Sequence, residues 1–137
     1  MPNQLRFSLP GSKDSVSAVR LAVASYANSS GFSLLDVEDI SVAISEACKI
    51  ICCHGHDRLA CRFLVLVGMM EDTLRITISD SNGEYTIEKG ECQRCGHCPE
   101  DGDLAMFILS SLMDKAELSD QPGGGKTLVM EKKRGLE

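Results

Sequence analysis

Hydrophobic and polar residues alternate with two different periods along the chain, and the periods predict its elements. Residues 5–9 and 73–79 alternate residue by residue, as strands with one solvated face do. Residues 61–69 are almost wholly apolar, which predicts a strand that is covered on both faces. Residues 116–119 and 126–132 flank a glycine-rich turn and predict a final hairpin. The sequence therefore predicts five strands, four of them in adjacent pairs.

Three other segments repeat apolar residues at helical spacing. The first begins after a cap residue, Ser12 or Asp14, and places valines on one face. The second opens at Ser33 with the pattern of a capping box and runs to about His54. The third resumes helical spacing over residues 104–112. These segments predict three helices.

The order of elements predicts the fold class. It reads strand, helix, helix, strand, strand, loop, helix, strand, strand. Because strands outnumber helices and come in adjacent pairs, we predict an α+β fold, a two-layer α/β sandwich. Its sheet should be mixed and mostly antiparallel, with about three helices on one face. A chain of 137 residues that is 43% hydrophobic has the size of one domain, so we expect residues 1–137 to form a single unit.

A carboxylate stands in the middle of the apolar second helix. The core-facing stripe of this helix is expected at Val37, Ile40, Ile44, Ala47 and Ile51. Glu46 shares the other face with Ile50, four residues later. The acid either lies at the helix edge with its carboxylate in water, or it lines a ligand-binding site, where carboxylates with perturbed pKa values gather.

Composition excludes some classes of function. Fourteen basic and twenty acidic side chains give a formal net charge of −6, which argues against direct binding to nucleic acid. No apolar run approaches the length of a membrane span, and the first residues lack a signal pattern. We therefore expect a cytoplasmic protein with no membrane contact.

Cysteines supply a second candidate site. The chain has seven, and an odd number in an intracellular protein predicts free thiols or metal ligands rather than disulfides. Cys92, Cys95 and Cys98, with His97 among them, have the two-residue gaps that suit a metal ion such as zinc. The alternative is a loop with reduced, unliganded thiols. Residues 80–102, which contain this cluster, show no period and are predicted to form a long functional loop.

The order of elements, Glu46 in the central helix, Asp80 after the first hairpin and the glycine-rich final hairpin resemble the histidine-kinase-like ATPase (GHKL) superfamily. Within it, residues 45–48 and 107–114 are similar to the anti-sigma factor serine kinase group. The resemblance covers nearly the whole chain. It implies one ATPase domain over residues 1–137, in which residues 80–102 correspond to the lid over bound ATP.

The same resemblance implies a nucleotide site. Its residues would be Glu46, Asp80, Gly83, Gly102, Leu104, Ala105, Gly125 and Thr127, and its cofactors ATP and Mg²⁺. Glu46 would be the catalytic base, Asp80 and Thr127 would hold adenine, and the backbone near Ala105 would face phosphate. Where the family has an asparagine that binds Mg²⁺, this chain has Ile50, which has no oxygen to donate. Asp103 stands where a phosphate-binding glycine is expected.

Three hypotheses about function follow. The first is an anti-sigma regulatory factor that binds a sigma factor and an anti-anti-sigma protein of the STAS type, forms a homodimer as relatives do, and phosphorylates its partner with ATP. The second is a protein-binding module of the same fold that has lost Mg-ATP chemistry. The third is a metal or redox sensor built on the cysteine cluster. We favour a regulator of this family in which ATP use is altered or lost.

Overall fold

One five-stranded sheet forms the first layer of the structure. The computed structural model describes residues 4–52, 62–80, 103–120 and 126–135. The strands are β1 (Leu5–Pro10), β2 (Arg62–Met70), β3 (Thr73–Asp80), β4 (Lys115–Asp120) and β5 (Lys126–Lys133), in the order β1-β2-β3-β5-β4. All four neighbouring pairs of these strands are antiparallel. The prediction of a mostly antiparallel sheet is therefore confirmed.

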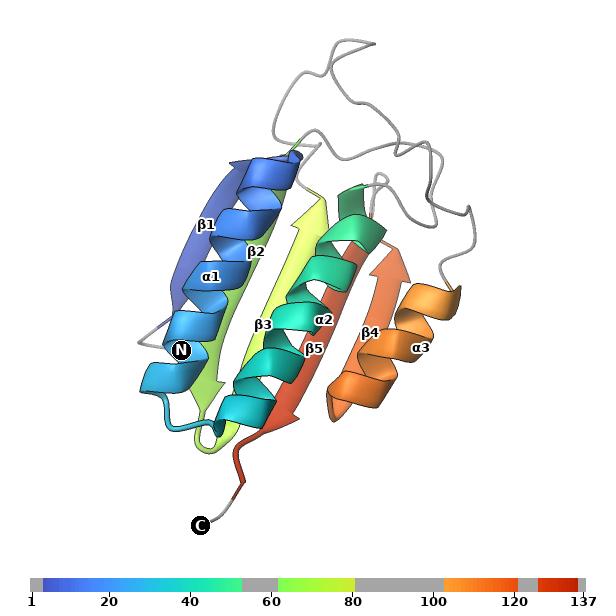
Figure 1. Ribbon diagram of the computed structural model, residues 1–137. Helices are drawn as coiled ribbons and strands as arrows, with labels where there is room; N and C mark the ends of the chain where they lie inside the picture. The colour runs from blue at the N-terminus through green and yellow to red at the C-terminus, as the bar shows by residue number, and fades with distance from the viewer. Residues whose placement is uncertain (1–3, 53–61, 81–102, 121–125, 136–137) are drawn as a thin grey trace, which may run out of the picture.

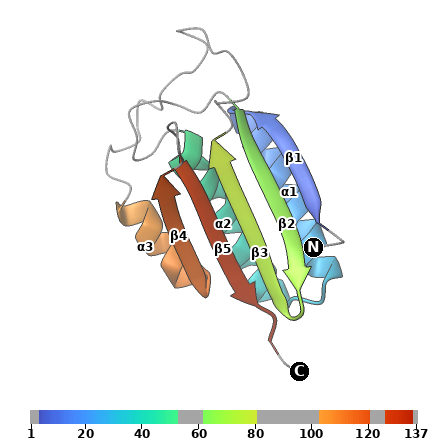
Figure 2. The same ribbon diagram turned by 180° about the vertical axis from the view of Figure 1, so that it is seen from behind.

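Three helices form the second layer and cover one face of the sheet (Figures 1 and 2). They are α1 (Lys13–Ser29), α2 (Leu34–Cys52) and α3 (Asp103–Leu112). α2 lies between the other two helices and packs against both of them. The predicted α+β sandwich of two layers is thus confirmed. None of the helices in the described ranges is long and apolar enough to cross a membrane.

Local signals in the sequence place the helix starts. The Ser12 hydroxyl accepts a hydrogen bond from the backbone N–H of Ser15 at 3.3 Å, so Ser12 is the cap of α1. The Ser33 hydroxyl likewise accepts from the N–H of Asp36 at 3.2 Å, one residue before α2 begins. Between β2 and β3, Glu71 adopts a φ of 58°, which closes the tight hairpin turn. The predicted end of the second helix at His54 lies outside the described residues.

The core fills the space between the helices and one face of the sheet. Leu74, Ile76 and Ile78 alternate with partly exposed polar residues along β3 and have 0% exposure. The predicted stripe on α2 is buried as well, apart from the partly buried Val37. Ile50, on the other face, is also fully buried, because α2 has a helix on each side. Burial of such side chains contributes about 1.5–3 kcal/mol each to folding.

One expectation about a covered surface is wrong. β2 was expected to be covered on both faces, yet the covered face is the one toward the helices, where Phe63, Val65 and Val67 are buried and Met69 packs against the core. Leu64 and Leu66 lie partly exposed on the open face, by which we mean the face of the sheet opposite the helices. The reason is that all three helices pack on the same side.

In α3, the apolar residues at helical spacing that begin with Leu104 and Phe107 lie on the outer face of the helix, away from the core. Leu104 and Phe107 are 63% and 70% exposed, whereas Ala105, Leu109 and Met113 are buried. Because α3 sits at the margin of the helical layer, only one narrow face of it meets the core.

Replacement of Ile76 by alanine tests the position of this core. The variant should lower the free energy of unfolding by about 2–5 kcal/mol, because it leaves a cavity between the sheet and the helices. Leu21→Ala on α1 is the control. Because Leu21 is 63% exposed, this variant should lower the free energy of unfolding by about 0.5 kcal/mol or less. Urea denaturation followed by circular dichroism measures both. Equal losses would contradict the described core.

Candidate functional site

The candidate site lies at one edge of the sheet, where the ends of four elements meet. α2 and β3 end at this edge, and α3 and β5 begin there (Figure 1). The antiparallel pairing of β3 with β5 produces this arrangement, since one strand must end where its neighbour starts. Five predicted site residues belong to these element ends and are described: Glu46, Asp80, Leu104, Ala105 and Thr127.

Asp80 and Thr127 form the part of the edge that belongs to the sheet. Asp80 is the last residue of β3 and is only 6% exposed. Thr127 on β5 pairs with Ser79, the residue before Asp80, and it is partly exposed. Because Thr127 is paired with Ser79, its side chain lies on the open face, whereas Asp80, the next residue of β3, points toward the helical layer. The buried carboxylate of Asp80 alone suits recognition of a ligand with hydrogen-bond donors on the helical side, such as an adenine amino group.

Glu46 lies at the border between the core and solvent. Its side chain is 22% exposed, so it is neither a core acid nor a fully solvated one. Lys49, one turn later on α2, places its Nζ 3.7 Å from Oε1 of Glu46, and the Lys49 side chain is 51% exposed. An exposed pair of this spacing contributes about 0.3–0.5 kcal/mol at most. The position permits Glu46 to line a site at this edge, with a cation beside it.

Lys49 is the residue that the sequence interpretation missed at this site. The signal was present, because an acid followed three residues later by a lysine on a helix brings opposite charges together. The Glu46 carboxylate therefore already has an ammonium group of its own helix as a neighbour when a ligand or partner protein approaches.

Ile50 lies one turn beyond Glu46 and does not fit a magnesium site. The residue has 0% exposure and only carbon atoms in its side chain. Mg²⁺ takes oxygen ligands in near-octahedral geometry, and this position of α2 offers none. Among the described residues, no group of three or more histidines, cysteines and acids could hold a metal ion. Position 50 therefore supplies no ligand for the Mg²⁺ that phosphoryl transfer would use.

The start of α3 forms the last part of the edge. Backbone N–H groups at a helix start attract anions such as phosphate, as the resemblance implies for Leu104 and Ala105. Ala105 is buried at 7% exposure and Leu104 is open to solvent. The helix begins at Asp103, where the resemblance expects a glycine.

The remaining predicted site residues lie outside the described residues. They are Gly83, Gly102, Gly125 and the cluster Cys92, Cys95, His97 and Cys98. The lid over residues 80–102 falls there too, apart from Asp80. Its role and that of the cysteines stay predictions. Outside this cluster, Cys48 on α2 lies in the core with 0% exposure.

Comparison with known proteins gives a consistent result. A family model described as "Histidine kinase-like ATPase domain" matches residues 9–132. The serine-protein kinases RsbW of Bacillus cereus (strain AH187) and Bacillus mycoides (strain KBAB4) are each 30% identical to this chain, over 94% of its length and 84% of theirs.

Two solved structures share the fold. One holds the RsbU and RsbW domains of a Mycobacterium tuberculosis protein, with a TM-score of 0.71 and 17% identity. The match covers 98% of this chain and 33% of that longer one. The other is the SiaB–SiaC complex from Pseudomonas aeruginosa, with a TM-score of 0.57, 13% identity, and coverage of 93% and 88%. At these identities the structures support the fold alone.

Replacement of Ile50 by asparagine tests the burial of the position beside Glu46. The variant should lower the free energy of unfolding by about 3 kcal/mol, because it buries an amide without hydrogen-bond partners and loses apolar contact. Ile50→Val is the matched control and should cost about 0.5–1.5 kcal/mol. Chemical denaturation measures both variants. If asparagine costs no more than valine, position 50 faces solvent or a polar cavity.

Proposed function

This chain belongs to the histidine kinase-like ATPase domain family and groups with serine-protein kinase RsbW, and on that premise we propose that it is an anti-sigma regulatory factor. It would bind a sigma factor and, in exchange, an anti-anti-sigma protein of the STAS type. The similarity to RsbW over 94% of the chain is the observation that carries the proposal. A neighbour of the same fold, SiaB, was itself solved in a complex with a second protein. The chain would act as a single domain in the cytoplasm.

The geometry of the candidate site supports regulation by protein contact, with ATP use altered or lost. Asp80 supplies a buried carboxylate at the end where adenine would bind, while Thr127 on the adjacent strand lies on the other face of the sheet. At the opposite end, the buried hydrocarbon of Ile50 stands in place of a metal ligand and Asp103 brings negative charge. The chain would therefore hold its partners without a magnesium-dependent step.

The alternative is an ATP-dependent serine kinase, as its relatives are named. Glu46 favours it, since its side chain is partly exposed to solvent and a positioned carboxylate can take the proton of a serine hydroxyl. In that case the nucleotide would contact Glu46, Asp80 and Thr127, with Leu104 and Ala105 facing phosphate. Glycines 83, 102 and 125 would complete the site.

Calorimetry with a non-hydrolysable ATP analogue separates the two. We expect no gain in affinity for the analogue when Mg²⁺ is added, because Ile50, one turn after Glu46, offers no oxygen ligand. Tight binding that depends on Mg²⁺ would establish the kinase alternative. Asp80→Ala is the control variant, since loss of binding in it would place any bound nucleotide at the proposed edge.

The cysteine cluster offers a sensor as a further alternative, based on the spacing of Cys92, Cys95 and Cys98 with His97. Metal analysis of the protein used for calorimetry tests it. Zinc at one ion per chain would support the sensor. Substoichiometric zinc and iron would leave the cysteines as reduced thiols.

We also propose that the chain forms a homodimer through the open face of its sheet. Leu66, Thr77 and Val129 form one cross-strand row on this face, and all three are partly exposed. Arg75 and Glu131 lie opposite each other on the same face, with Nε and Oε2 3.8 Å apart. A strand such as β2, with leucines on the side away from the core, suits burial against a second sheet.

Leu66→Lys tests this dimer. We expect the unchanged chain to sediment as a dimer at micromolar concentration and the variant to sediment as a monomer, because a lysine ammonium would be buried in the interface. Leu21→Lys on the helical layer should leave the dimer intact. A monomeric unchanged chain, or a variant that still dimerises, would rule out the open face as the interface.

A further inference from the structure

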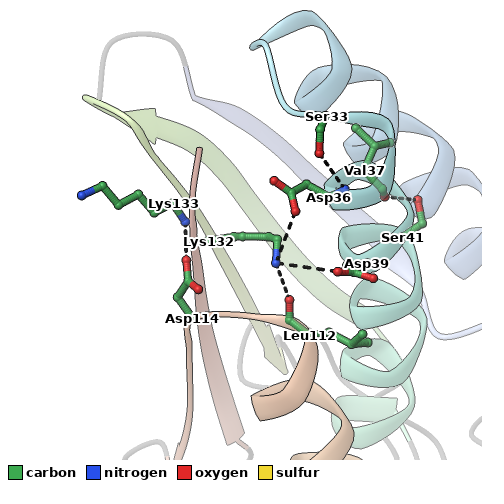
Figure 3. A network of polar contacts seen from close by, with 9 residues as sticks. All are labelled: Ser33, Asp36, Val37, Asp39, Ser41, Leu112, Asp114, Lys132 and Lys133. Atoms are coloured by element: carbon green, nitrogen blue, oxygen red, sulfur yellow. Dashed lines mark hydrogen bonds and ion pairs between the residues drawn. The ribbon is translucent and has the colours of Figure 1, made fainter. Parts of the chain in front are cut away.

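A buried lysine joins three elements at the edge of the molecule opposite the candidate site. Lys132 on β5 points toward the helices and is 9% exposed. Its Nζ donates a hydrogen bond to the backbone oxygen of Leu112, the last residue of α3, at 2.6 Å. The same Nζ lies 3.9 Å from Oδ1 of Asp36 and 3.9 Å from Oδ2 of Asp39, both on α2 (Figure 3). Lysines are rarely buried unless they are paired in this way.

Each contact of Lys132 is electrostatically favourable. The carbonyl groups at the end of α3 carry partial negative charge, which attracts a cation. Asp36 stands in the first turn of α2, where an acid is favoured, and it offers its carboxylate to the lysine. One ammonium group thus bridges the end of one helix and the beginning of another, and its own backbone belongs to the sheet.

A second set of bonds holds the chain around Lys132. The N–H of Lys133 donates to Oδ2 of Asp114 at 2.6 Å, and the N–H of Asp114 donates to the oxygen of Glu131 at 2.9 Å. These bonds fix the turn between α3 and β4 on the end of β5 (Figure 3). The position of Leu112, just before this turn, is therefore set relative to the sheet.

α2 and α3 run in opposite directions, so Lys132 and the candidate site lie at opposite ends of both helices (Figure 1). Ten residues separate Asp36 from Glu46, which is about 15 Å of helix. Eight residues separate Leu112 from Leu104, which is about 12 Å. Between these ends, Ala105 and Leu109 are buried in the apolar core that includes α2. Apolar packing restricts how the two helices lie against each other, and the directional bonds of Lys132 add a fixed point at one end of the contact.

We propose that Lys132 is a positioning residue that sets the register of α3 against α2. Its directional hydrogen bond and two ion pairs fasten the far ends of the helices to the sheet. The near ends, which carry Glu46 on α2 and Leu104 with Ala105 on α3, then keep a fixed separation. The inference rests on the proposed function only in that these near ends are taken as the functional site.

Hydrogen exchange followed by mass spectrometry tests the inference on the free chain, without nucleotide or partner. In Lys132→Met, amides of residues 46–51 and 107–109, whose N–H groups close the first turns of α3, should exchange about tenfold faster, as loss of a charge-assisted bond permits. Lys132→Arg should restore most of the protection. Lys133→Met is the matched control, because Lys133 is a 64% exposed neighbour whose ion pair is with Asp72, and it should leave these amides unchanged.

The location of the change decides the outcome. Acceleration confined to residues 33–39 and 110–114 would show a merely local bond and overturn the proposal, as would equal effects in Lys133→Met. If Lys132→Met does not fold, the double variant Asp36→Asn, Asp39→Asn replaces it, since it keeps the lysine and its bond to Leu112. That variant should accelerate exchange at the same remote amides, and unchanged exchange there would overturn the proposal. Because no ligand is involved, failure of the proposed function leaves this result intact.

Discussion

The structure depends on the burial of one face of an antiparallel sheet beneath α2. The alternating apolar residues of β3 and β5 meet the apolar face of this helix, and both sets are removed from water. Burial of apolar surface is the main favourable term in folding, so this contact fixes where the central helix lies. Once α2 is fixed across the sheet, its carboxyl end must lie beside the end of β3. The candidate site is a consequence of that placement, since α2, which carries Glu46, and β3, which ends at Asp80, end at the same edge.

The same burial constrains what the site can do. α2 has a helix on each side, so positions on its flanks become core positions, and Ile50 is one of them. An isoleucine there adds apolar contact to the packing of the helix and offers no oxygen to a cation. Glu46 lies at the border with solvent, with Lys49 beside it. Regulation by protein contact, as proposed above, requires a surface at this edge that is complementary to the partner and requires no metal ligand there.

Much of the fold follows from local pattern. The strict alternation of β3, the cap at Ser33 and the stripe on α2 are short-range signals, and the structure follows all three. Exposure of Leu104 and Phe107 could not be predicted, because periodicity shows which residues share a face but not which face meets a neighbour. The contacts of Lys132 could not be predicted from the sequence either. Its partners Asp36 and Leu112 come from segments far apart in the chain, so only the tertiary structure brings them together. For the site, Asp80 and Thr127 belong to ends of adjacent strands but lie on opposite faces of the sheet, which a strand-level reading of the sequence did not reveal, and the glycines and cysteines of the predicted lid lie outside the described residues.

The central claim is that this chain regulates by protein contact and does not need magnesium-bound nucleotide to do so. Its most direct test is the equilibrium affinity for a sigma factor or STAS-type protein of the same organism, measured once with EDTA and once with Mg²⁺ and ATP. The account predicts binding in both conditions with the same dissociation constant. Binding that appears only with Mg²⁺ and ATP, or that is lost as the partner becomes phosphorylated, would contradict it.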